Sequence, residues 1–383
     1  MTNPHSALPN RPQPEPSKVL NVGVSMLTLV PGGMGGSETY ARELTRQLAA
    51  SRTVKATCYV NDGARGFSEG TDEIVVPGLT GGSSTIQRLI TLAKGIIKRK
   101  SILGLMRPMD VFHVPFTVPL PKPAKEAPFV QTLLDVQHLD LPELFGLADK
   151  LYRKIFYEKT ARDADAIITI SDFAKTSIVN HLGIDPAKIF TAHLGVNAEE
   201  FIPNLGQRGN FIMYPARGWK HKNHATLFEA MKLLAVSNPE LRLVLTGGAL
   251  DTLTDVPDNV EVRGLVPLPE LRELYRTAAC MVFPSLYEGF GLPPLEAMAS
   301  GCPVASSTAG SLPEIVGEAA VLFDPEDPEA IASAIRTAIS RTEELQTLGL
   351  QQVQKFTWER CAEVHEQAYR YAFNLRTRNS STA

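Results

Sequence analysis

The chain has 383 residues, of which 44% are hydrophobic and 21% are charged. This composition is typical of a globular protein, and the length predicts two domains. The formal net charge of −3 disfavours a nucleic-acid-binding protein, whose surface should be basic. No apolar run reaches the roughly 18 residues of a bilayer span, and the amino terminus has no signal-peptide pattern. Cys58, Cys280, Cys302 and Cys361 lack metal-type spacing, so we expect free thiols in a reducing cytoplasm.

The first half of the chain alternates short apolar runs with amphipathic stretches. Residues 1–17 hold five prolines among polar residues and predict a disordered tail. After this tail we expect a helix at 37–50 and strands at 19–30, 57–60, 111–114, 129–134 and 166–170. This βα alternation is typical of a doubly wound parallel sheet.

The second half repeats this α/β pattern. We expect strands at 211–214, 241–246, 260–263, 281–283 and 303–305, with helices between them. The stretch 199–210 contains Pro203 and Gly206 and divides the halves, so we place the domains at 18–203 and 204–356. A last helix begins near residue 357 and extends through 373. Two Rossmann-like domains should bind a ligand between the carboxyl ends of their strands.

Two carboxylates flank a glycine-bearing turn that reads Glu288-Gly-Phe-Gly-Leu-Pro-Pro-Leu-Glu296. Gly289 and Gly291 allow a ligand to approach the backbone, and the two prolines fit a first helical turn. The N–H groups of that turn and the helix dipole suit a diphosphate, while the carboxylates suit sugar or ribose hydroxyls. The alternative is that Glu296 only favours the helix start and that Glu288 is a solvated turn residue.

A basic segment follows the expected strand at 211–214. It reads Ala-Arg217-Gly-Trp-Lys-His-Lys222-Asn-His. Arg217 can bind phosphate oxygens in a bidentate fork, while Lys222 acts as a point charge. A solvated basic loop is the alternative interpretation.

Residues 288–296, in which two glutamates are separated by seven residues (E-x7-E), are one of several segments that point to the same protein family. Others are Asp163-Ala-Asp165-Ala-Ile-Ile-Thr-Ile-Ser171, Gly195-Val-Asn197 and Gly301-Cys-Pro-Val304. With them the chain resembles the retaining glycosyltransferases of family 4 (group 1), and within these it is mannosyltransferase-like, from about residue 18 to about residue 370. The resemblance implies the GT-B fold, with two Rossmann-like domains facing a cleft and a C-terminal helix, 357–383, that crosses back to the first domain.

The resemblance also implies how the donor, a nucleotide diphosphate sugar, is bound. Glu288 would contact hydroxyls of the transferred sugar, and Glu296 the ribose. The implied diphosphate-binding residues are Arg217, Lys222, Gly289, Phe290, Gly291 and Leu292. Asp163-Ala-Asp165 has the letters of a metal-binding pair, but it lies between a helix and a strand, which in the family is a structural junction. We therefore expect no metal and no other cofactor. Glu314 is interpreted as a helix-start acid rather than a ligand.

A glycine-rich segment, 31–38, follows the first strand. Glu38 stands where a dinucleotide fingerprint requires its third glycine, which disfavours a nicotinamide-dependent oxidoreductase. In the family this loop faces the donor phosphates, and Gly35 and Gly36 are the candidates for that contact. A flexible βα turn is the alternative.

The segment 131–143 departs from the family's pattern. Relatives usually carry a His-Asp pair at the end of this strand, whereas here Leu134 occupies the His position and Asp135 remains. Either His138 enters the site through an altered loop, or the sugar is recognised without imidazole, or activity is weakened. These alternatives stay open, and the predicted catalytic residues are Glu288, His138 and Asp135.

Residues 85–107 predict one or two amphipathic helices with a basic face. Such a helix can lie on anionic lipid, although packing on its own domain is the alternative. We expect a cytoplasmic protein, with peripheral contact to the inner membrane surface left open.

Together these features predict an enzyme that transfers a hexose to a glycan or lipid-linked acceptor, with retention, by front-face attack and without metal. Mannose from GDP-mannose is the first choice, because the segments 218–224 and 135–138 resemble those of mannosyltransferases. The alternative is a non-catalytic nucleotide-sugar-binding protein of the same fold.

Overall fold

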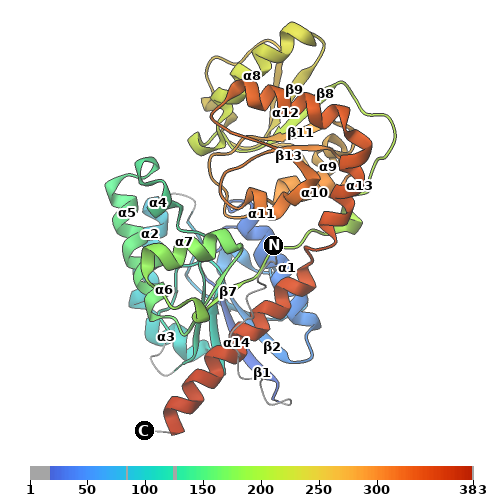
Figure 1. Ribbon diagram of the computed structural model, residues 1–383. Helices are drawn as coiled ribbons and strands as arrows, with labels where there is room; N and C mark the ends of the chain where they lie inside the picture. The colour runs from blue at the N-terminus through green and yellow to red at the C-terminus, as the bar shows by residue number, and fades with distance from the viewer. Residues whose placement is uncertain (1–17, 83–84, 124–126, 382–383) are drawn as a thin grey trace.

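The computed structural model describes residues 18–82, 85–123 and 127–381 and shows two domains built on parallel sheets (Figure 1). The tail predicted at 1–17 lies outside the described residues. The prediction of two Rossmann-like parallel-sheet domains is confirmed, while the exact domain bounds stay a prediction.

The first sheet has seven strands in the order β3-β2-β1-β4-β5-β6-β7, all parallel. Its strands are β1 (Leu20–Met26), β2 (Val54–Asn61), β3 (Asp72–Val76), β4 (Val111–Val114), β5 (Phe129–Thr132), β6 (Ala166–Thr169) and β7 (Ile189–Thr191). Strands β4, β5 and β6 are buried along their whole length, as expected for a parallel sheet covered on both faces.

The second sheet has six parallel strands in the order β10-β9-β8-β11-β12-β13. Its strands are β8 (Phe211–Pro215), β9 (Arg242–Thr246), β10 (Val260–Gly264), β11 (Cys280–Phe283), β12 (Val304–Ser307) and β13 (Ala320–Phe323). The order reverses beside β8 in this sheet and beside β1 in the first, and ligands bind at such points in open α/β sheets.

Helices connect the strands and cover the sheets. In the first domain they are α1 (Gly36–Ala50), α2 (Thr85–Ile97), α3 (Arg99–Leu105), α4 (Gln137–Asp140), α5 (Leu147–Arg153), α6 (Lys159–Asp163) and α7 (Asp172–Leu182). A π-helical turn, Lys154–Glu158, joins α5 to α6. The later helices are α8 (His224–Ser237), α9 (Leu268–Thr277), α10 (Leu292–Ala299), α11 (Leu312–Val316), α12 (Pro328–Ser340), α13 (Thr342–Val353) and α14 (Trp358–Ser381).

Three strands were not expected from the sequence, and all three lie at sheet edges. They are β3, β7 and β13. An edge strand pairs on one side only, so it needs less apolar burial and has a weaker pattern. β3 begins with two acidic residues, and β7 has only three residues, Ile-Phe-Thr.

The C-terminal helix α14 packs against α1 and strands β4 to β7 of the first domain. A buried chain of hydrogen bonds joins them. His365 Nδ1 lies 2.8 Å from the carbonyl oxygen of Cys361, so this nitrogen carries the hydrogen. Nε2 therefore accepts from the Tyr40 hydroxyl at 2.7 Å, and the Tyr40 oxygen lies 2.9 Å from Thr132 Oγ1.

The same chain continues through a second histidine. Thr132 Oγ1 lies 2.8 Å from His113 Nε2, and His113 Nδ1 lies 2.9 Å from the Tyr369 hydroxyl. Burial lowers the pKa of His365 to about 4 and that of His113 well below its usual range, so both rings are neutral near pH 7. From Tyr369 to His365, each group can then donate a hydrogen bond to the following one. This continuous chain fixes the position of α14 on the first domain.

The chain crosses between the domains twice, and the two crossings run side by side. Val196 N donates to the Phe356 carbonyl oxygen at 3.2 Å. A β-carbon at Gly195 would lie 2.3 Å from the backbone nitrogen of Trp358, so only glycine allows this approach. The predicted family segment at 195–197 is therefore part of the connection between the domains.

Across the described part of the chain, no helix combines the length and the apolar composition that a membrane span requires.

Candidate functional site

Loops from the carboxyl edges of both sheets meet between the domains. Gly35 lies after β1, and a β-carbon there would lie 3.9 Å from Nη2 of Arg217, which follows β8. A β-carbon at Gly36 would lie 3.7 Å from Leu292 Cδ1. The structure thus brings together four of the predicted donor-binding residues, two from each domain.

The loop between β11 and α10 carries Glu288, and its backbone packs against Gly310 and Ser311. Gly310 has a φ of 63°, and a β-carbon there would lie 2.6 Å from the carbonyl oxygen of Glu288. Ser311 Oγ donates to the Phe290 carbonyl oxygen at 2.6 Å and lies 3.0 Å from the Glu288 carbonyl oxygen, which accepts from Ser311 N at 3.2 Å. The backbone of residues 288–290 is therefore set by the segment that follows β12.

Helix α10 begins at the end of this loop. Gly291 is its N-cap with a φ of 121°, a conformation that L residues rarely adopt. Pro293 and Pro294 occupy the first turn, where their missing N–H groups cost little. The amides that this helix start offers to an anion are those of Leu292 and of the loop residues before it.

Lys222 and Glu288 form an enclosed ion pair. Lys222 Nζ lies 2.5 Å from Glu288 Oε1, and each side chain is 14% exposed. Breaking such a pair from one side leaves a charge without its partner in a poorly hydrated place. Burial and the charge of Lys222 lower the pKa of His221 and of His224 to about 4, so these rings add no positive charge near pH 7.

Glu296 lies on α10, and its carboxylate contacts α9 of the same domain. Tyr275 donates to Glu296 Oε2 at 2.9 Å. Burial raises the pKa of Glu296, although the hydrogen bond from Tyr275 acts in the opposite direction. The implied contact of Glu296 with a ribose stays a prediction.

Asp135 meets the Glu288 loop from the first domain. A β-carbon at Gly289 would lie 3.1 Å from Asp135 Oδ2, so the absence of a side chain at Gly289 lets the two segments approach. The other carboxylate oxygen accepts from Gln137 N at 3.0 Å. Burial raises the pKa of Asp135, which favours its protonated form compared with a solvated aspartate.

His138 points away from this cluster. Its side chain is 1% exposed, and Nε2 lies 3.5 Å from Glu158 Oε1. The ring packs edge-on against Phe145 and Tyr157, with centroid distances of 6.3 and 6.0 Å. Burial lowers the pKa of His138, so the ring is neutral near pH 7. A ring enclosed in this way cannot touch a substrate in this conformation, and its predicted catalytic role stays a prediction.

Several contacts across the domain interface were not predicted. Tyr287 donates to Asp140 Oδ2 at 2.9 Å, and Ser171 Oγ donates to the Gly289 carbonyl oxygen at 2.8 Å. The rings of Phe173 and Tyr287 meet in a T-shaped arrangement, 5.6 Å between centroids. Each joins segments more than 100 residues apart, which no local pattern in the sequence indicates.

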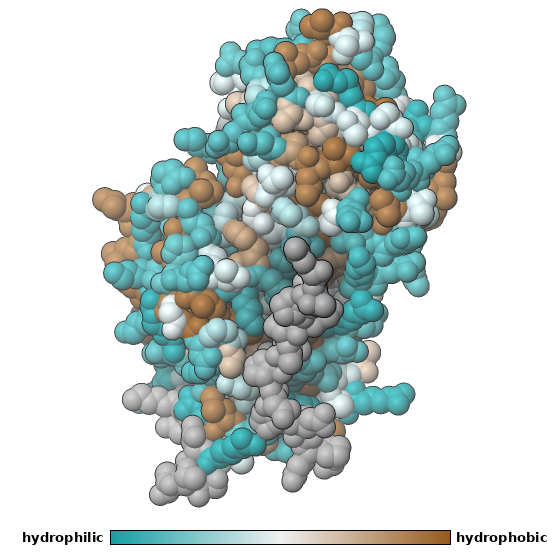
Figure 2. All heavy atoms as spheres, in the orientation of Figure 1, coloured by the Kyte–Doolittle hydropathy of each residue, from teal (hydrophilic) through white to brown (hydrophobic). Residues whose placement is uncertain are grey.

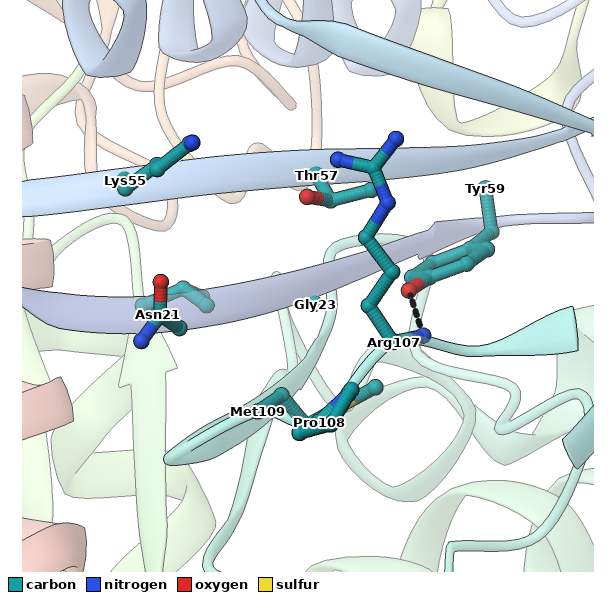
Figure 3. A pocket seen from close by; sticks show the side chains of 9 residues that line it. Asn21, Gly23, Lys55, Thr57, Tyr59, Arg107, Pro108 and Met109 are labelled. Carbon is teal, nitrogen blue, oxygen red and sulfur yellow. Dashed lines mark hydrogen bonds between the residues drawn. The ribbon is translucent and has the colours of Figure 1, made fainter.

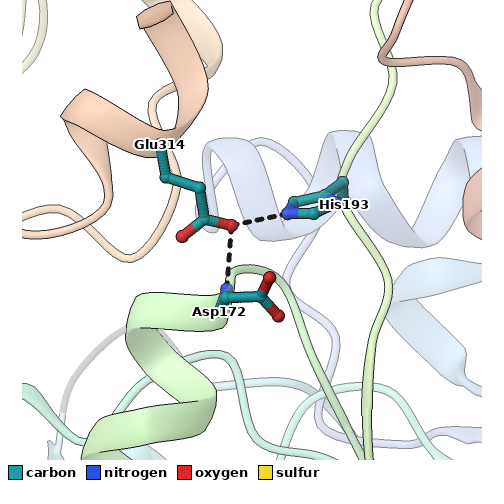
Figure 4. A group of neighbouring side chains, drawn as sticks. All are labelled: Asp172, His193 and Glu314. Carbon is teal, nitrogen blue, oxygen red and sulfur yellow. Dashed lines mark hydrogen bonds and ion pairs between the residues drawn. The ribbon is translucent and has the colours of Figure 1, made fainter. Parts of the chain in front are cut away.

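Asp172, His193 and Glu314 form a group whose ligand-type atoms lie within 4.8 Å of one another (Figure 4). His193 Nε2 donates to Glu314 Oε1 at 2.6 Å, and Asp172 N donates to the same oxygen at 2.8 Å. Glu314 does lie in the first turn of α11, as expected, but its carboxylate faces the other domain.

A separate cavity lies on the first sheet, beside the amino-terminal halves of β1 and β2 (Figure 3). Its lining includes Asn21, Lys55, Thr57 and Tyr59, and its volume is about 70 Å³. Ligand sites for molecules of drug size usually enclose about 300 Å³ or more. This cavity is therefore too small for a nucleotide sugar.

Two family models match the chain. One, described as Glycosyltransferase Family 4, covers residues 34–200, and the other, Glycosyl transferases group 1, covers residues 196–352. O-antigen chain mannosyltransferase B of Escherichia coli is 30% identical over 267 residues, which span 63% of this chain and 70% of that protein.

Solved structures share the fold. Sucrose-phosphate synthase from Thermosynechococcus elongatus has a TM-score of 0.74 at 21% identity, covering 93% of this chain and all of that one. HepE from Anabaena, in complex with UDP-glucose, has a TM-score of 0.66 at 17% identity, covering 91% of this chain and 99% of that one.

Proposed function

The chain belongs to the group 1, family 4 glycosyltransferases of the GT-B fold, and from this premise we propose that it transfers a hexose from a nucleotide diphosphate sugar to a hydroxyl of a glycan or lipid-linked acceptor. The donor we propose first is GDP-mannose. The name of the E. coli relative supports mannose, while the UDP-glucose bound to the Anabaena protein keeps a uridine donor in the test set.

The arrangement of Arg217 and Lys222 carries this proposal. Arg217 faces Gly35 across the interface, and Lys222 contacts Glu288, so two fixed cations flank the loop that would hold the donor. As the bond between sugar and diphosphate breaks, negative charge grows on the leaving group. Cations held in place stabilise that charge more than the ground state.

We propose that the reaction proceeds with retention by front-face attack and without a metal ion. In this mechanism the leaving diphosphate helps to deprotonate the acceptor hydroxyl, and the protein supplies positioning and charge stabilisation. Glu288 would hold the sugar hydroxyls, and Asp135, which lies beside Gly289, would border the same sugar. Arg217 and Lys222 would supply the positive charge that a metal supplies elsewhere.

A screen of nucleotide sugars tests the proposal. GDP-mannose, at a hundred times its dissociation constant, should stabilise the protein by about 2.7 kcal/mol, measured as a rise in Tm, with UDP-glucose, GDP and NAD as comparisons. Incubation with the donor that binds and a lipid-linked or glycan acceptor should then form a product of retained anomeric configuration by NMR. Binding of none of these nucleotide sugars would contradict the proposal.

A non-catalytic binding protein is the second candidate, favoured by Leu134 in the usual His position and by the burial of His138. The two candidates differ in turnover. If donor binds but neither transfer nor donor hydrolysis occurs, and the Glu288→Gln variant changes only affinity, the binding protein is the correct description.

We also propose that the enzyme is cytoplasmic and touches an anionic membrane through the outer side of its first domain. Leu147 and Leu151 on α5 are 86% and 60% exposed, and Ile96 and Ile97 on α2 are 65% and 83% exposed. Figure 2 shows hydrophobic surface at this edge, where Figure 1 draws α5. The two helices belong to one region, because Tyr152 packs against the apolar cluster that contains α2.

Basic residues accompany this apolar surface. Lys94, Lys98 and Lys100 are exposed on or beside α2 and α3, and a surface of this kind suits anionic lipid. The prediction from the sequence of one or two helices at 85–107 is confirmed as two, α2 and α3.

Replacing Lys94 and Lys100 by glutamate together with Ile97→Ser should abolish co-sedimentation with vesicles of phosphatidylglycerol. Each lysine near an anionic surface contributes about 1 kcal/mol, so two charge reversals and one lost apolar contact exceed the energy of a weak peripheral association. The control is Val236→Ser, at a residue of the second domain that is 87% exposed. The proposal would be contradicted if both variants bound the vesicles equally, or if the parent protein did not bind them.

A further inference from the structure

Glu314 caps a helix that belongs to the other domain. It lies on α11 in the second domain, and its carboxylate accepts from the first backbone amides of α7 in the first domain (Figure 4). Asp172 N lies 2.8 Å from Oε1, and Phe173 N lies 3.0 Å from Oε2. A carboxylate at this end of a helix also interacts favourably with the helix dipole. The bond is therefore both directional and charge-assisted.

The local cap of α7 leaves these two amides to Glu314. Ser171 is the N-cap, and its hydroxyl oxygen accepts from Ala174 N at 3.0 Å. The first amides of a helix have no partner within it, so they need an acceptor from elsewhere. The second domain supplies that acceptor, which couples the order of the α7 start to the position of the domain.

His193 completes the contact from the connecting segment. Its Nε2 donates to Glu314 Oε1 at 2.6 Å, and its ring meets the Phe356 ring edge-on, 5.6 Å between centroids. Val196 and Phe356, which join the two interdomain crossings, lie just beyond it. Although burial alone would raise the pKa of Glu314, the hydrogen bonds from His193 and from the two amides lower it, so the carboxylate is charged near pH 7.

The same helix start also receives the loop that carries Glu288. Ser171 Oγ donates to the Gly289 carbonyl oxygen at 2.8 Å, and Phe173 packs against Tyr287. Any rotation that separates Glu314 from α7 must therefore also move residues 287–289 away from the first domain. The position of Glu288 relative to Gly35 and Asp135 depends on this contact.

We propose that Glu314 is a positioning residue that holds the two domains closed by capping α7 across the interface. The inference rests on the proposed function, because it assigns Glu314 the task of placing the Glu288 loop for transfer. A metal ion at the Asp172–His193–Glu314 group is not needed to explain the geometry, since both oxygens of Glu314 already accept hydrogen bonds.

Two variants remove the contact from opposite sides. Glu314→Gln removes the charge and turns one acceptor into a donor. Asp172→Pro removes the amide hydrogen that Oε1 accepts, at a first helical position where proline is tolerated. Ser171 has φ −153° and ψ 159°, a conformation that a following proline allows. Asp172→Ala is the matched variant, because it lacks the side chain and keeps the amide.

The arrangement of the domains is measured directly, by the distance between spin labels at introduced cysteines. Lys159→Cys in α6 and Val236→Cys in α8 are exposed sites, whereas the four native cysteines are buried. Glu314→Gln and Asp172→Pro should broaden the distance distribution toward longer values, with or without nucleotide. The parent, Asp172→Ala and Asp327→Ala should share one narrow distribution. Asp327 accepts from Glu329 N and Ala330 N at the start of α12, so its loss removes a cap within one domain.

In the transfer assay, Glu314→Gln and Asp172→Pro should lower kcat by about ten- to hundredfold, as expected when a reacting group is misplaced by about 1 Å. Affinity for the nucleotide should fall less than kcat, because neither residue touches the donor and only the contacts of Gly35 and Gly36 are lost when the domains separate. Parental distance distributions in both variants would overturn the inference, as would equal losses of kcat in Asp172→Ala and Asp172→Pro. The distance measurement needs no substrate, so it decides the inference even if the proposed transfer activity is absent.

Discussion

Replacing Arg217 and Lys222 together by glutamine should lower kcat for sugar transfer by at least about a thousandfold. A single fixed donor to a developing negative charge contributes about 100- to 1,000-fold in enzymes that stabilise an oxyanion. Arg217 faces Gly35 from the second domain, and Lys222 lies 2.5 Å from Glu288. The variant would remove both fixed charges that we assign to the leaving diphosphate. Single-turnover rates measured with saturating donor would report the loss without interference from product release.

Lys220→Gln is the control for this prediction. Lys220 lies in the same loop but is exposed, so its loss should change kcat little. Circular dichroism should show that the double variant is folded, since Glu288 loses its partner when Lys222 is replaced. Transfer at the parental rate in the double variant would refute the role of these cations. Activity that disappears with a chelator and returns with magnesium would refute the proposed metal independence.

Gly310→Ala should lower kcat by about a hundredfold or more, although Gly310 contacts no substrate in the proposed mechanism. The new β-carbon would lie 2.6 Å from the carbonyl oxygen of Glu288 and 2.8 Å from its nitrogen. Backbone atoms cannot give way as a flexible side chain can, so the loop carrying Glu288 must shift. A shift of about 1 Å in a catalytic group can cost about a hundredfold in rate. Steady-state kinetics with saturating donor and acceptor, together with Tm, would measure the effect.

Gly183→Ala separates this steric effect from backbone strain. Gly183 ends α7 with a φ of 62°, against 63° at Gly310, but a β-carbon there would meet no atom within 4 Å. Both variants place an alanine in the left-handed conformation, which costs about 1–2 kcal/mol, whereas only Gly310→Ala displaces Glu288. Gly183→Ala should lower Tm slightly because of this strain, and its kcat should stay at the parental value. Parental kcat in Gly310→Ala would show that the Glu288 loop tolerates displacement.

The parts of the site that follow strands were accessible from the sequence. Gly35, Arg217 and Asp135 each come soon after a strand whose apolar run is evident, and parallel strands end at the same edge of a sheet. That rule alone predicts that such residues gather between the domains. It cannot predict which of them touch, since the contact of Gly289 with Asp135 depends on the angle between the two domains.

The remaining parts depend on contacts that have no local signal. Glu314 has the position of an ordinary helix-start acid, yet its oxygens bind amides 141 and 142 residues earlier in the chain. His138 shows the opposite case. Its position near a strand end led to the prediction of a catalytic role, but the short helix α4 turns its ring toward Glu158. The side on which a one-turn helix places a residue is set by packing, here against Phe145 and Tyr157.

The hydrogen-bonded chain from Tyr369 through His113, Thr132 and Tyr40 to His365 has a consequence for biosynthesis. Two of its five members are supplied by α14, which is translated after the second domain. The domain translated first is therefore interrupted in sequence and cannot complete its interior until the second domain has been made. Cutting the gene between the domains would separate α1 from α14, so a separately expressed first domain needs residues 358–381 joined back to it.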